Sequence, residues 1–389
     1  MEKLFETMSD MKTFEATVVS CRPGKKEGYE ITLDRTAFFP EGGGQPFDTG
    51  VLGGASVHAV HIKDGEIIHY TDKPITPGET VTGTIDWERR FDHMQQHSGE
   101  HILTGLIHKR FGYDNVGFHM GKEEVTIDFN GAITPEELEE LEMEANEVIH
   151  NRVPIIAFYP GEEALKEIDY RSKKELNEAI RIVEIPGVDT CACCGTHVAD
   201  SGQVGIIKVL GMIHYKSGVR ISMLCGKRAV KDGIAKQKQV TAISNLLSAK
   251  PEAIVDAVTK MKQEYTETKE QLYGLYLEMF RMKTNTYPDS HGFLTVVEEQ
   301  LSPVQLRQFC TMLMEEKKGK AVLVCSMKEE GCWYYAAGSQ ALDMKTVGKQ
   351  LNEMLCGKGG GSSQMVQGTF QAKKEQIIDV MNTLEGEYC

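Results

Sequence analysis

Two short motifs, almost a hundred residues apart, carry side chains of the kind that bind transition metals. The first contains His97 and His101, and the second contains Cys193 and His197. In each motif the two side chains are four residues apart, and on the helix predicted for the first motif that spacing places His97 and His101 on one face. Three imidazoles and one thiolate make the tetrahedral ligand set that zinc prefers. The sequence therefore predicts a zinc site where the two motifs meet.

The sulfur ligand and the role of the metal stay open at this level. The second motif holds three cysteines, Cys191, Cys193 and Cys194, and the four-residue spacing to His197 favours Cys193. Four protein ligands are typical of a structural zinc site, whereas a catalytic zinc keeps one position for water or substrate. The metal either takes part in catalysis or organises a pocket in which other groups act.

A second interpretation comes from Glu100. The first motif also matches H-x-x-E-H, a zinc peptidase signature in which Glu100 would be the general base. Such a peptidase takes a further carboxylate ligand from a downstream helix and has no use for a Cys/His turn. The Cys193–His197 pair therefore argues against a peptidase, and we expect Glu100 to point away from the metal on a solvent face.

The sequence patterns around these residues predict an α+β chain of four parts. Residues 1–89 contain short β-branched runs between Gly, Pro and Asp turn signals, which is typical of a small β-barrel. Residues 90–228 predict an α/β core that carries the zinc site. Its predicted elements are a helix over 92–110, a hairpin over 116–129, a helix opened by Thr134 and a short helix over 169–178.

The remaining two parts are a linker and a C-terminal domain. Residues 229–288 are polar and helical, and apolar residues between 258 and 279 recur three and four positions apart. That heptad pattern predicts a coiled coil or an antiparallel helical hairpin. Residues 289–389 alternate helices with strands and include a glycine-rich turn over 356–364, which predicts an α/β domain.

Composition narrows the class of function. The 389 residues are 41% hydrophobic and 26% charged, as in a soluble globular protein, and the net charge of -14 excludes a general nucleic-acid binder. Residues 208–238 nevertheless hold eight basic residues against one acid, which predicts a local phosphate track. Its predicted RNA contacts are Lys216, Arg220, Lys227 and Arg228. With no visible secretory signal or membrane span, we expect a cytoplasmic protein that binds no membrane.

Three separated motifs resemble one known family. "HMQQHSGEH" and "CCGTHV" resemble the editing domain of alanyl- and threonyl-tRNA synthetases. The segment Thr36–Gly50 resembles the glycine-rich motif that precedes this domain in alanyl-type proteins. Residues 358–367 resemble the glycine-rich motif of the DHH-associated domain that ends alanyl-tRNA synthetase. Because no adenylate-forming domain is recognised, the whole chain resembles the free-standing alanyl-tRNA editing proteins of the AlaX group, in their long form.

That resemblance implies a function. Members of the family would hydrolyse the ester of alanine tRNA mischarged with serine or glycine, with zinc as the cofactor. By resemblance, Thr36 and Gln45 lie at the catalytic pocket, and the Thr36 hydroxyl is the candidate to contact a serine hydroxyl. The implied partners are tRNA and a second subunit bound through the C-terminal domain. The alternatives are the H-x-x-E-H peptidase and a tRNA-binding module without catalysis.

Overall fold

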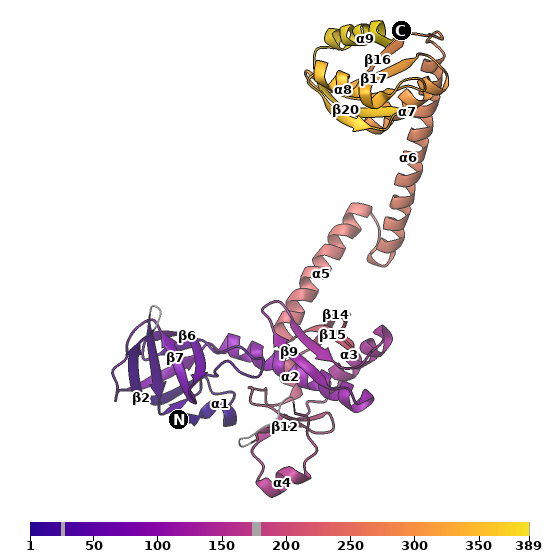
Figure 1. Cartoon of the computed structure of the whole chain (residues 1–389). Helices are drawn as coiled ribbons and strands as arrows, with labels where there is room; N and C mark the ends of the chain where they lie inside the picture. The colour runs from indigo at the N-terminus through magenta and orange to yellow at the C-terminus, as the bar shows by residue number, and fades with distance from the viewer. Residues whose placement is uncertain (25–27, 173–179, 389) are drawn as a thin grey trace. The chain divides into compact units, whose positions relative to one another are not determined.

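The chain folds into two compact units, Met1–Ala242 and Ile243–Cys389 (Figure 1). The computed structural model describes residues 1–24, 28–172 and 180–388. Helices and strands alternate in both units, so the predicted mixed α+β class is confirmed. Among the described residues, no helix has both the length and the apolar character needed to cross a bilayer.

The first unit begins with a closed barrel of six strands. In barrel order these are β2 (Thr13–Pro23), β3 (Tyr29–Leu33), β7 (Glu66–Thr71), β6 (Ala55–Lys63), β5 (Gly50–Leu52) and β8 (Thr80–Ile85). Burial alternates strictly along β8, because successive side chains of a strand point to opposite faces. Short β1 (Glu2–Lys3) pairs with β4 (Arg35–Thr36), and α1 (Leu4–Thr7) lies between them in the chain.

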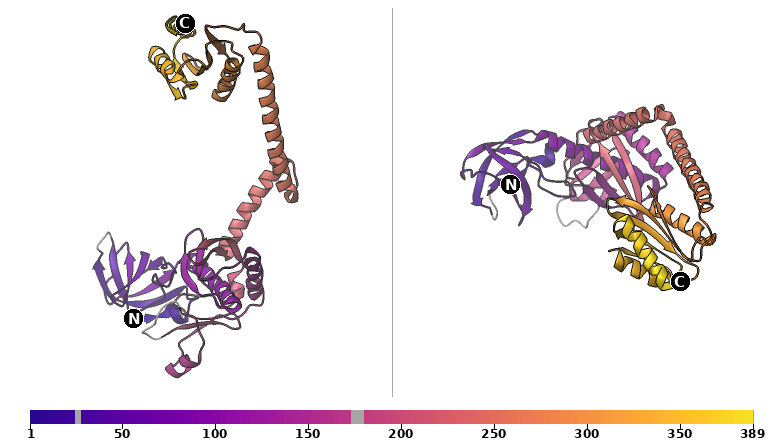
Figure 2. Two further views of the ribbon diagram at one scale, coloured as in Figure 1. Left: turned by 45° about the vertical axis from the view of Figure 1, so that its right-hand side comes forward. Right: turned by 90° about the horizontal axis from the view of Figure 1, so that it is seen from above.

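A four-stranded antiparallel sheet follows, in the order β14 (Ile207–Tyr215), β15 (Gly218–Cys225), β10 (Val125–Phe129), β9 (Asn115–Met120). Helices α2 (Trp87–Phe111) and α3 (Pro135–His150) pack on this sheet and on each other (Figure 1 and Figure 2). The Asp86 carboxylate accepts the backbone N–H of Arg89 and so caps α2, and Thr134 and Glu137 form the predicted capping box of α3. The hairpin expected over 116–129 is confirmed as β9 and β10.

A small three-stranded sheet presents the cysteine motif. Its strands are β11 (Ile156–Phe158), β12 (Ile182–Ile185) and β13 (Asp189–Ala192), accompanied by α4 (Glu162–Glu167) and the 3-10 helix η1 (Ser201–Val204). The short helix predicted over 169–178 falls mostly on residues 173–179, outside the described residues. Its described part is not helical, since Arg171 forms a bridge with Cys191 instead.

One buried ion pair fixes the barrel's glycine-rich segment against α2. Arg90 on α2 and Asp48 in that segment are both fully buried, and the guanidinium donates to both carboxylate oxygens. Asp48 also accepts the backbone N–H of Phe39 at 2.7 Å, and Arg90 donates to the carbonyl of Ser9 at 2.9 Å. A buried pair with this many hydrogen bonds sets geometry more than stability. It sets the position of Gln45 relative to the helix.

The second unit contains a long helix and a five-stranded sheet. Helix α5 (Gly226–Leu247) spans the boundary between the units, and η2 (Pro251–Ala253) leads into α6 (Ile254–Thr284). The sheet order is β16 (Phe293–Glu298), β17 (Ala321–Glu329), β18 (Cys332–Gly338), β20 (Met365–Gln371), β19 (Lys358–Gly361). Helices α7 (Pro303–Glu315), α8 (Met344–Met354) and α9 (Lys374–Tyr388) complete the alternation that the sequence predicted.

The prediction of a glycine-rich turn over 356–364 is partly wrong. Residues Lys358–Gly361 form the edge strand β19, paired antiparallel with β20. A Cβ atom on Gly359 would lie 2.4 Å from the carbonyl oxygen of Gln367, so the strands approach this closely only because the side chain is absent. Four glycine-rich residues favour a turn by propensity, and the close pairing overrides that preference.

Candidate metal centre

Helix α2 carries the first pair of candidate ligands. His97 and His101 lie one turn apart with ring centroids separated by 5.3 Å, and both are buried. The buried stretch of α2 continues on either side of them, from His93 to Ile107. The helix therefore holds both imidazoles rigidly inside the unit.

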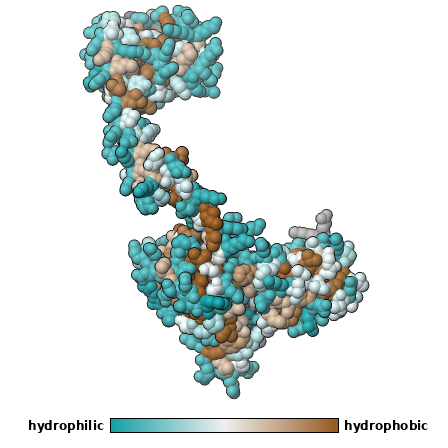
Figure 3. Space-filling view, turned by 180° about the vertical axis from the view of Figure 1, so that it is seen from behind, coloured by the Kyte–Doolittle hydropathy of each residue, from teal (hydrophilic) through white to brown (hydrophobic). Residues whose placement is uncertain are grey.

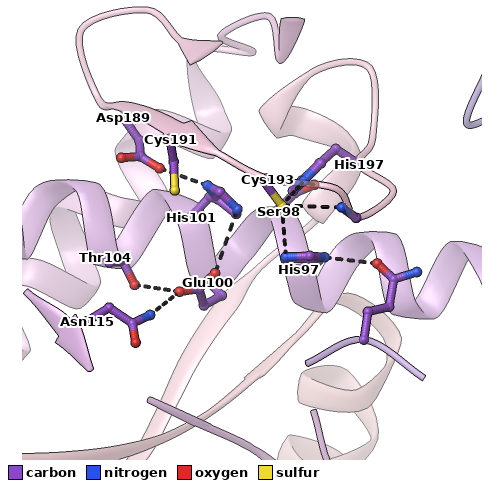
Figure 4. A network of polar contacts seen from close by, with 12 residues as sticks. His97, Ser98, Glu100, His101, Thr104, Asn115, Asp189, Cys191, Cys193 and His197 are labelled. Atoms are coloured by element: carbon purple, nitrogen blue, oxygen red, sulfur yellow. Dashed lines mark hydrogen bonds and ion pairs between the residues drawn. The ribbon is translucent and has the colours of Figure 1, made fainter. Parts of the chain in front are cut away.

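The turn after β13 carries the second pair. Arg181 donates to the carbonyls of Cys193, at 3.0 Å, and Gly195, at 2.9 Å, which fixes the shape of the turn. A Cβ atom on Gly195 would lie 2.1 Å from the His97 ring, so this position must be glycine for the turn to approach α2. Cys193 and His197 then face the two α2 histidines (Figure 4).

The four candidate ligand side chains lie close together. One ligand atom from each of His97, His101, Cys193 and His197 lies within 4.8 Å of every other. Cys193 Sγ is 3.5 Å from His97 Nε2 and 3.4 Å from His197 Nε2. Zinc bonds of about 2.3 Å to sulfur and about 2.0 Å to nitrogen, at a tetrahedral angle, separate the two atoms by about 3.5 Å. These residues therefore fit a tetrahedral zinc ion.

Among the three cysteines of the motif, Cys193 is the one whose sulfur joins all three histidines. Cys191 is buried on the far side of His101, where it forms a second group with His101 and Asp189, and Cys194 is exposed. The four-residue spacing to His197 therefore gave the geometrically suitable cysteine.

Each histidine has a polar partner on the ring nitrogen that faces away from the cluster. His97 Nδ1 donates to Gln45 Oε1 at 2.9 Å, and His101 Nδ1 donates to Asp189 Oδ2 at 2.8 Å. His197 Nδ1 lies 3.2 Å from the hydroxyl of Ser98. Such partners fix the tautomer that leaves Nε2 available to a metal, and they raise its basicity.

The electrostatics of the cluster favour a thiolate. Burial alone would raise the pKa of Cys193, but the charges of His97, His197 and His101 hold it well below its usual value. Burial also opposes a charge on His101, yet the Cys193 sulfur and Asp189 raise its pKa well above the usual value. Burial lowers the pKa of His197 to about 3. The thiolate is the form of cysteine that coordinates zinc, whereas His101, whose pKa is raised, must lose a proton before its Nε2 atom can bind a metal.

Glu100 does not point to solvent, and that expectation was wrong. The side chain is fully buried, and its carboxylate accepts hydrogen bonds from Thr104 Oγ1, at 3.0 Å, and Asn115. Its second oxygen lies 3.9 Å from His101 Nε2, the nitrogen that faces the cluster. The reason is that α2 is buried around most of its circumference, so the residue between the ligands has no solvent face to occupy.

The two predicted catalytic residues lie in different surroundings. Gln45 contacts the cluster directly through His97, and its amide also bonds Thr196 at 2.8 Å. Thr36 is fully buried beside the barrel, where its hydroxyl donates to His69 Nε2 at 2.8 Å and accepts the N–H of Phe38 at 3.1 Å. The structure therefore brings Gln45, but not Thr36, into contact with the four-residue cluster.

The four predicted RNA contacts fall into two groups, and their arginines are engaged. Arg220 on β15 makes a two-pronged ion pair with Asp128, at 2.6 and 2.8 Å, and stacks on Tyr215, with Lys216 beside the same ring. Arg228 at the start of α5 pairs with Asp92, and Lys227 approaches Glu88 at 3.4 Å. The structure thus separates a hairpin pair from a pair at the start of α5.

Sequence reasoning missed Asp189, Ser98 and Arg171. Asp189 orients His101 and is itself held by Arg171, which donates to both carboxylate oxygens at 2.8 Å. Those hydrogen bonds keep the pKa of Asp189 at about 2 although burial would raise it. Nothing in residue type or spacing marks Asp189, whereas Ser98 could have been suspected from its place inside the first motif.

A family model matches the part of the first unit that carries the cysteine motif. Residues 180–239 match the family model described as the threonyl and alanyl tRNA synthetase second additional domain. That match includes Cys193, His197 and the start of α5.

Curated relatives extend the similarity to the whole chain. The alanyl-tRNA editing protein Aarsd1 of Danio rerio is 30% identical over 95% of this chain and 92% of its own length. The alanyl-tRNA editing protein AlaX-L of Pyrococcus horikoshii is 29% identical over 98% of this chain and 97% of its own. The alanine–tRNA ligase of Ignicoccus hospitalis is 31% identical over 98% of this chain but only 42% of its own length. The chain belongs to the family of alanyl-tRNA editing proteins.

Proposed function

We propose that this protein deacylates alanine tRNA that carries serine or glycine. The observation that carries the proposal is the convergence of His97, His101, Cys193 and His197 on one centre, with Gln45 from the glycine-rich segment bonded to it. The relatives are named alanyl-tRNA editing proteins, and these names supply the substrate class. The reaction is hydrolysis of the ester between the amino acid and the terminal ribose.

The physical reason for such an activity is the limited selectivity of a small pocket. A site built for alanine rejects glycine or serine by only about 1–3 kcal/mol, because the difference is one small group. Errors at that level call for a second site that hydrolyses the wrong product. A free-standing hydrolase meets that need without an adenylate-forming domain.

The metal belongs to this proposal. His97, His101, Cys193 and His197 would hold zinc, because their sulfur–nitrogen separations of 3.4 and 3.5 Å match tetrahedral coordination. A bound zinc ion supplies Lewis acidity, which polarises an ester carbonyl or lowers the pKa of water. Gln45, Asp189 and Ser98 keep the three imidazoles in the coordinating tautomer.

Thr36 enters the proposal as a selectivity residue whose hydroxyl must exchange partners. Its donor is used by His69 and its oxygen accepts from Phe38, so a serine hydroxyl would have to displace one of these contacts. A Thr36→Val variant separates the two roles. A selectivity residue changes the ratio of serine to alanine release, whereas a structural residue changes the melting temperature and leaves that ratio intact.

The RNA partner, the compartment and the domain limits complete the proposal. Lys216, Arg220, Lys227 and Arg228 would contact tRNA phosphates, and binding would weaken as salt rises. The cytoplasm, where thiols stay reduced, suits the nine described cysteines, all of which are free. We assign 1–89 to the barrel, 90–228 to the zinc-containing editing domain, 229–288 to the linker and 289–389 to the DHH-associated domain.

A homodimer through the second unit is supported by α6. Apolar side chains at heptad positions are exposed there: Val258, Met261, Tyr265, Leu272 and Leu275. With Val258 at position a, Glu264 falls at g and Lys269 at e. In a parallel pair, Glu264 of one copy meets Lys269 of the other, whereas an antiparallel pair sets like charges opposite each other. The occupant that fits this stripe is a second copy in parallel. Figure 3 shows apolar atoms, in brown, on the surface of the helical segment between the two globular parts of the chain.

One experiment separates deacylation from its alternatives. Purified protein is incubated with serine-charged alanine tRNA, and ester loss is followed beside the correctly charged tRNA and a zinc assay. We expect fast release of serine, slow release of alanine, and loss of both zinc and activity in His101→Ala. A non-catalytic module would bind the tRNA and release nothing, and an H-x-x-E-H peptidase would cleave peptides and leave the ester intact.

A further inference from the structure

A cavity of about 840 Å³ lies beside the metal cluster and contains none of its four ligands. Its walls come from the first turns of α2, the glycine-rich segment, the end of β9 and the start of α5. The residues that matter are His93, Pro46, Met120, Lys122 and Lys231. Lys227 and Arg228, proposed above as RNA contacts, also line this cavity.

Three walls of the cavity, from α2, the glycine-rich segment and β9, lie close to the four-residue cluster in the sequence or through direct contacts. His93 precedes His97 by four residues on α2, which is about 6 Å along the helix axis. Pro46 follows Gln45, whose side chain bonds His97. The backbone N–H of Met120 donates to the carbonyl of Gly44 at 3.3 Å, and nearby Phe118 stacks on His97 with centroids 5.2 Å apart. A ligand bound in the cavity would therefore lie next to a group that reacts at the four-residue cluster.

His93 has the surroundings of a ligand-binding group. It is 3% exposed, and its Nδ1 atom is enclosed without a hydrogen-bond partner among the described residues. Burial, followed by the charge of Arg89, lowers the pKa of His93 to about 4. The ring is therefore neutral near pH 7 and offers one donor and one acceptor, which suits a hydroxyl group or the edge of a base.

Unpaired cations line the same cavity. Within residues 1–24, 28–172 and 180–388, no ion pair engages Arg89, Lys122 or Lys231. The acids there are mostly engaged: Glu88 by Lys227, Asp92 by Arg228 and Asp232 by Lys236, while Asp86 caps α2 and Glu123 has no ion pair. The lining holds five basic and five acidic residues, so its formal charge is balanced, and Arg89, Lys122 and Lys231 are its cations without an ion pair to a described acid. Cations without an acidic partner are available to the phosphate groups of a ligand.

We propose that this cavity binds the 3′-terminal nucleotide of the RNA substrate, with His93 hydrogen-bonded to its ribose or base and Lys122 and Lys231 beside its phosphates. The proposal rests on the proposed function and adds the place where the RNA end is held. The nucleotide enters the cavity while the ester that it carries reaches the cluster next to it.

The test uses a ligand that cannot be hydrolysed, so that binding is read without activity. The probe is a short RNA ending in the tRNA 3′ sequence, with serine joined to the terminal ribose by an amide. Calorimetric titration compares the wild type with His93→Ala, and with His150→Ala as the matched control, since His150 is an exposed histidine on α3. We expect three- to tenfold weaker binding for His93→Ala and no change for the control.

A second variant keeps the test decisive if His93→Ala fails to fold. Lys122→Ala combined with Lys231→Ala should weaken binding and flatten its dependence on salt by about one charge per lysine. Wild-type affinity and salt dependence in this variant would overturn the proposal, and so would wild-type affinity in a folded His93→Ala. If the wild type binds the probe through His93 but leaves seryl-tRNA intact, deacylation fails while the nucleotide site stands.

Discussion

Helices α2 and α6 are both long, but they place their side chains in opposite ways. Sixteen of the 25 residues of α2 are buried, among them His97, Ser98, Glu100 and Thr104, which are polar. Only Phe280 and Thr284 are buried among the 31 residues of α6, while apolar side chains such as Tyr265 and Leu275 are more than 60% exposed. One helix buries polar groups and the other exposes apolar ones.

The difference shows two places where side chains are arranged at a cost in folding free energy, and where a function explains that cost. Burying a polar group costs free energy unless it is hydrogen-bonded, and on α2 the cost is offset by partners such as Gln45 and Asp189. Exposing an apolar stripe also costs free energy unless a partner covers it. We therefore interpret α2 as the helix that provides metal ligands and α6 as a helix whose exposed apolar stripe is a dimerisation surface.

The largest expected effect is on α2. His101→Ala and Cys193→Ala each remove one of the four ligands, so zinc content and deacylation should both collapse, the latter by about a thousandfold. Zinc analysis and ester release measure the two quantities on the same preparation. Cys194→Ala is the control, because its sulfur lies outside the cluster. Activity that survives without zinc would break the proposed link between burial and metal binding on α2.

A buried histidine away from the metal gives a reference for the cost of burying polar groups. Burial lowers the pKa of His69 to about 4, although its hydrogen bond to Ile31 acts in the opposite direction. Because the unfolded state binds the proton more readily, stability is complete above pH 6.5 and is lost as pH falls toward about 4. At roughly 1.4 kcal/mol per pKa unit, the loss is about 3 kcal/mol.

Urea unfolding at several pH values between 4 and 7 measures this dependence. His69→Gln keeps a donor and an acceptor but does not titrate, so its stability curve should be flatter by that amount. Equal slopes for the wild type and the variant would show that His69 is not the group responsible.

The next effect is on zinc affinity and concerns Asp189, which orients the candidate ligand His101 but is not one of the four candidate ligands. Asp189→Asn removes the charge that faces His101 and should weaken zinc binding by 10- to 100-fold. Competition with a chromogenic chelator measures the affinity. Asp200→Asn serves as the control, since Asp200 pairs with Arg152 and caps η1. Equal affinities would remove Asp189 from the metal centre.

The smallest effect on the fold is expected on α6. Leu272→Glu replaces an exposed side chain, so the free energy of unfolding of the second unit should change by less than about 0.5 kcal/mol. Self-association, measured by sedimentation equilibrium, should nevertheless be lost.

Charge exchange tests the direction of the pairing on α6. Glu264→Lys and Lys269→Glu should each dimerise more weakly than the wild type, because a parallel pair then changes from opposite to like charges at these positions. An antiparallel pair would hold like charges there before and after either change, so equal dimerisation of the wild type and the two variants would contradict the parallel direction. A monomeric wild type would show that no second copy covers the stripe.

The sequence predicted best where the signal was local. The capping residues Thr134 and Glu137 and the long helix that follows Pro251 depend on short-range spacing, and both are in place. The two pairs of candidate ligands four residues apart lie close enough together to hold a metal. The prediction of Glu100 failed because helical periodicity gives relative directions around an axis. It does not show that α2 is enclosed on most sides.

Long-range contacts account for what the sequence could not show. Asp189 and His101 are 88 residues apart in the sequence, and Gln45 and Thr196 are 151 apart. Neither contact can be predicted from the spacing of residues in a short motif. The resemblance supplied Gln45, but no motif supplied Asp189, and Thr36 proved to be bonded to His69 instead of the cluster. Strand β19 was missed because its glycines favour a turn until β20 pairs with them.

X-ray absorption at the zinc edge, on the purified protein, tests the shared metal centre most directly. We predict one sulfur at about 2.3 Å and three nitrogen ligands at about 2.0 Å, with the sulfur lost in Cys193→Ala. A zinc ion surrounded by oxygen alone, or a sulfur signal that survives Cys193→Ala, would contradict a centre shared by α2 and the turn after β13.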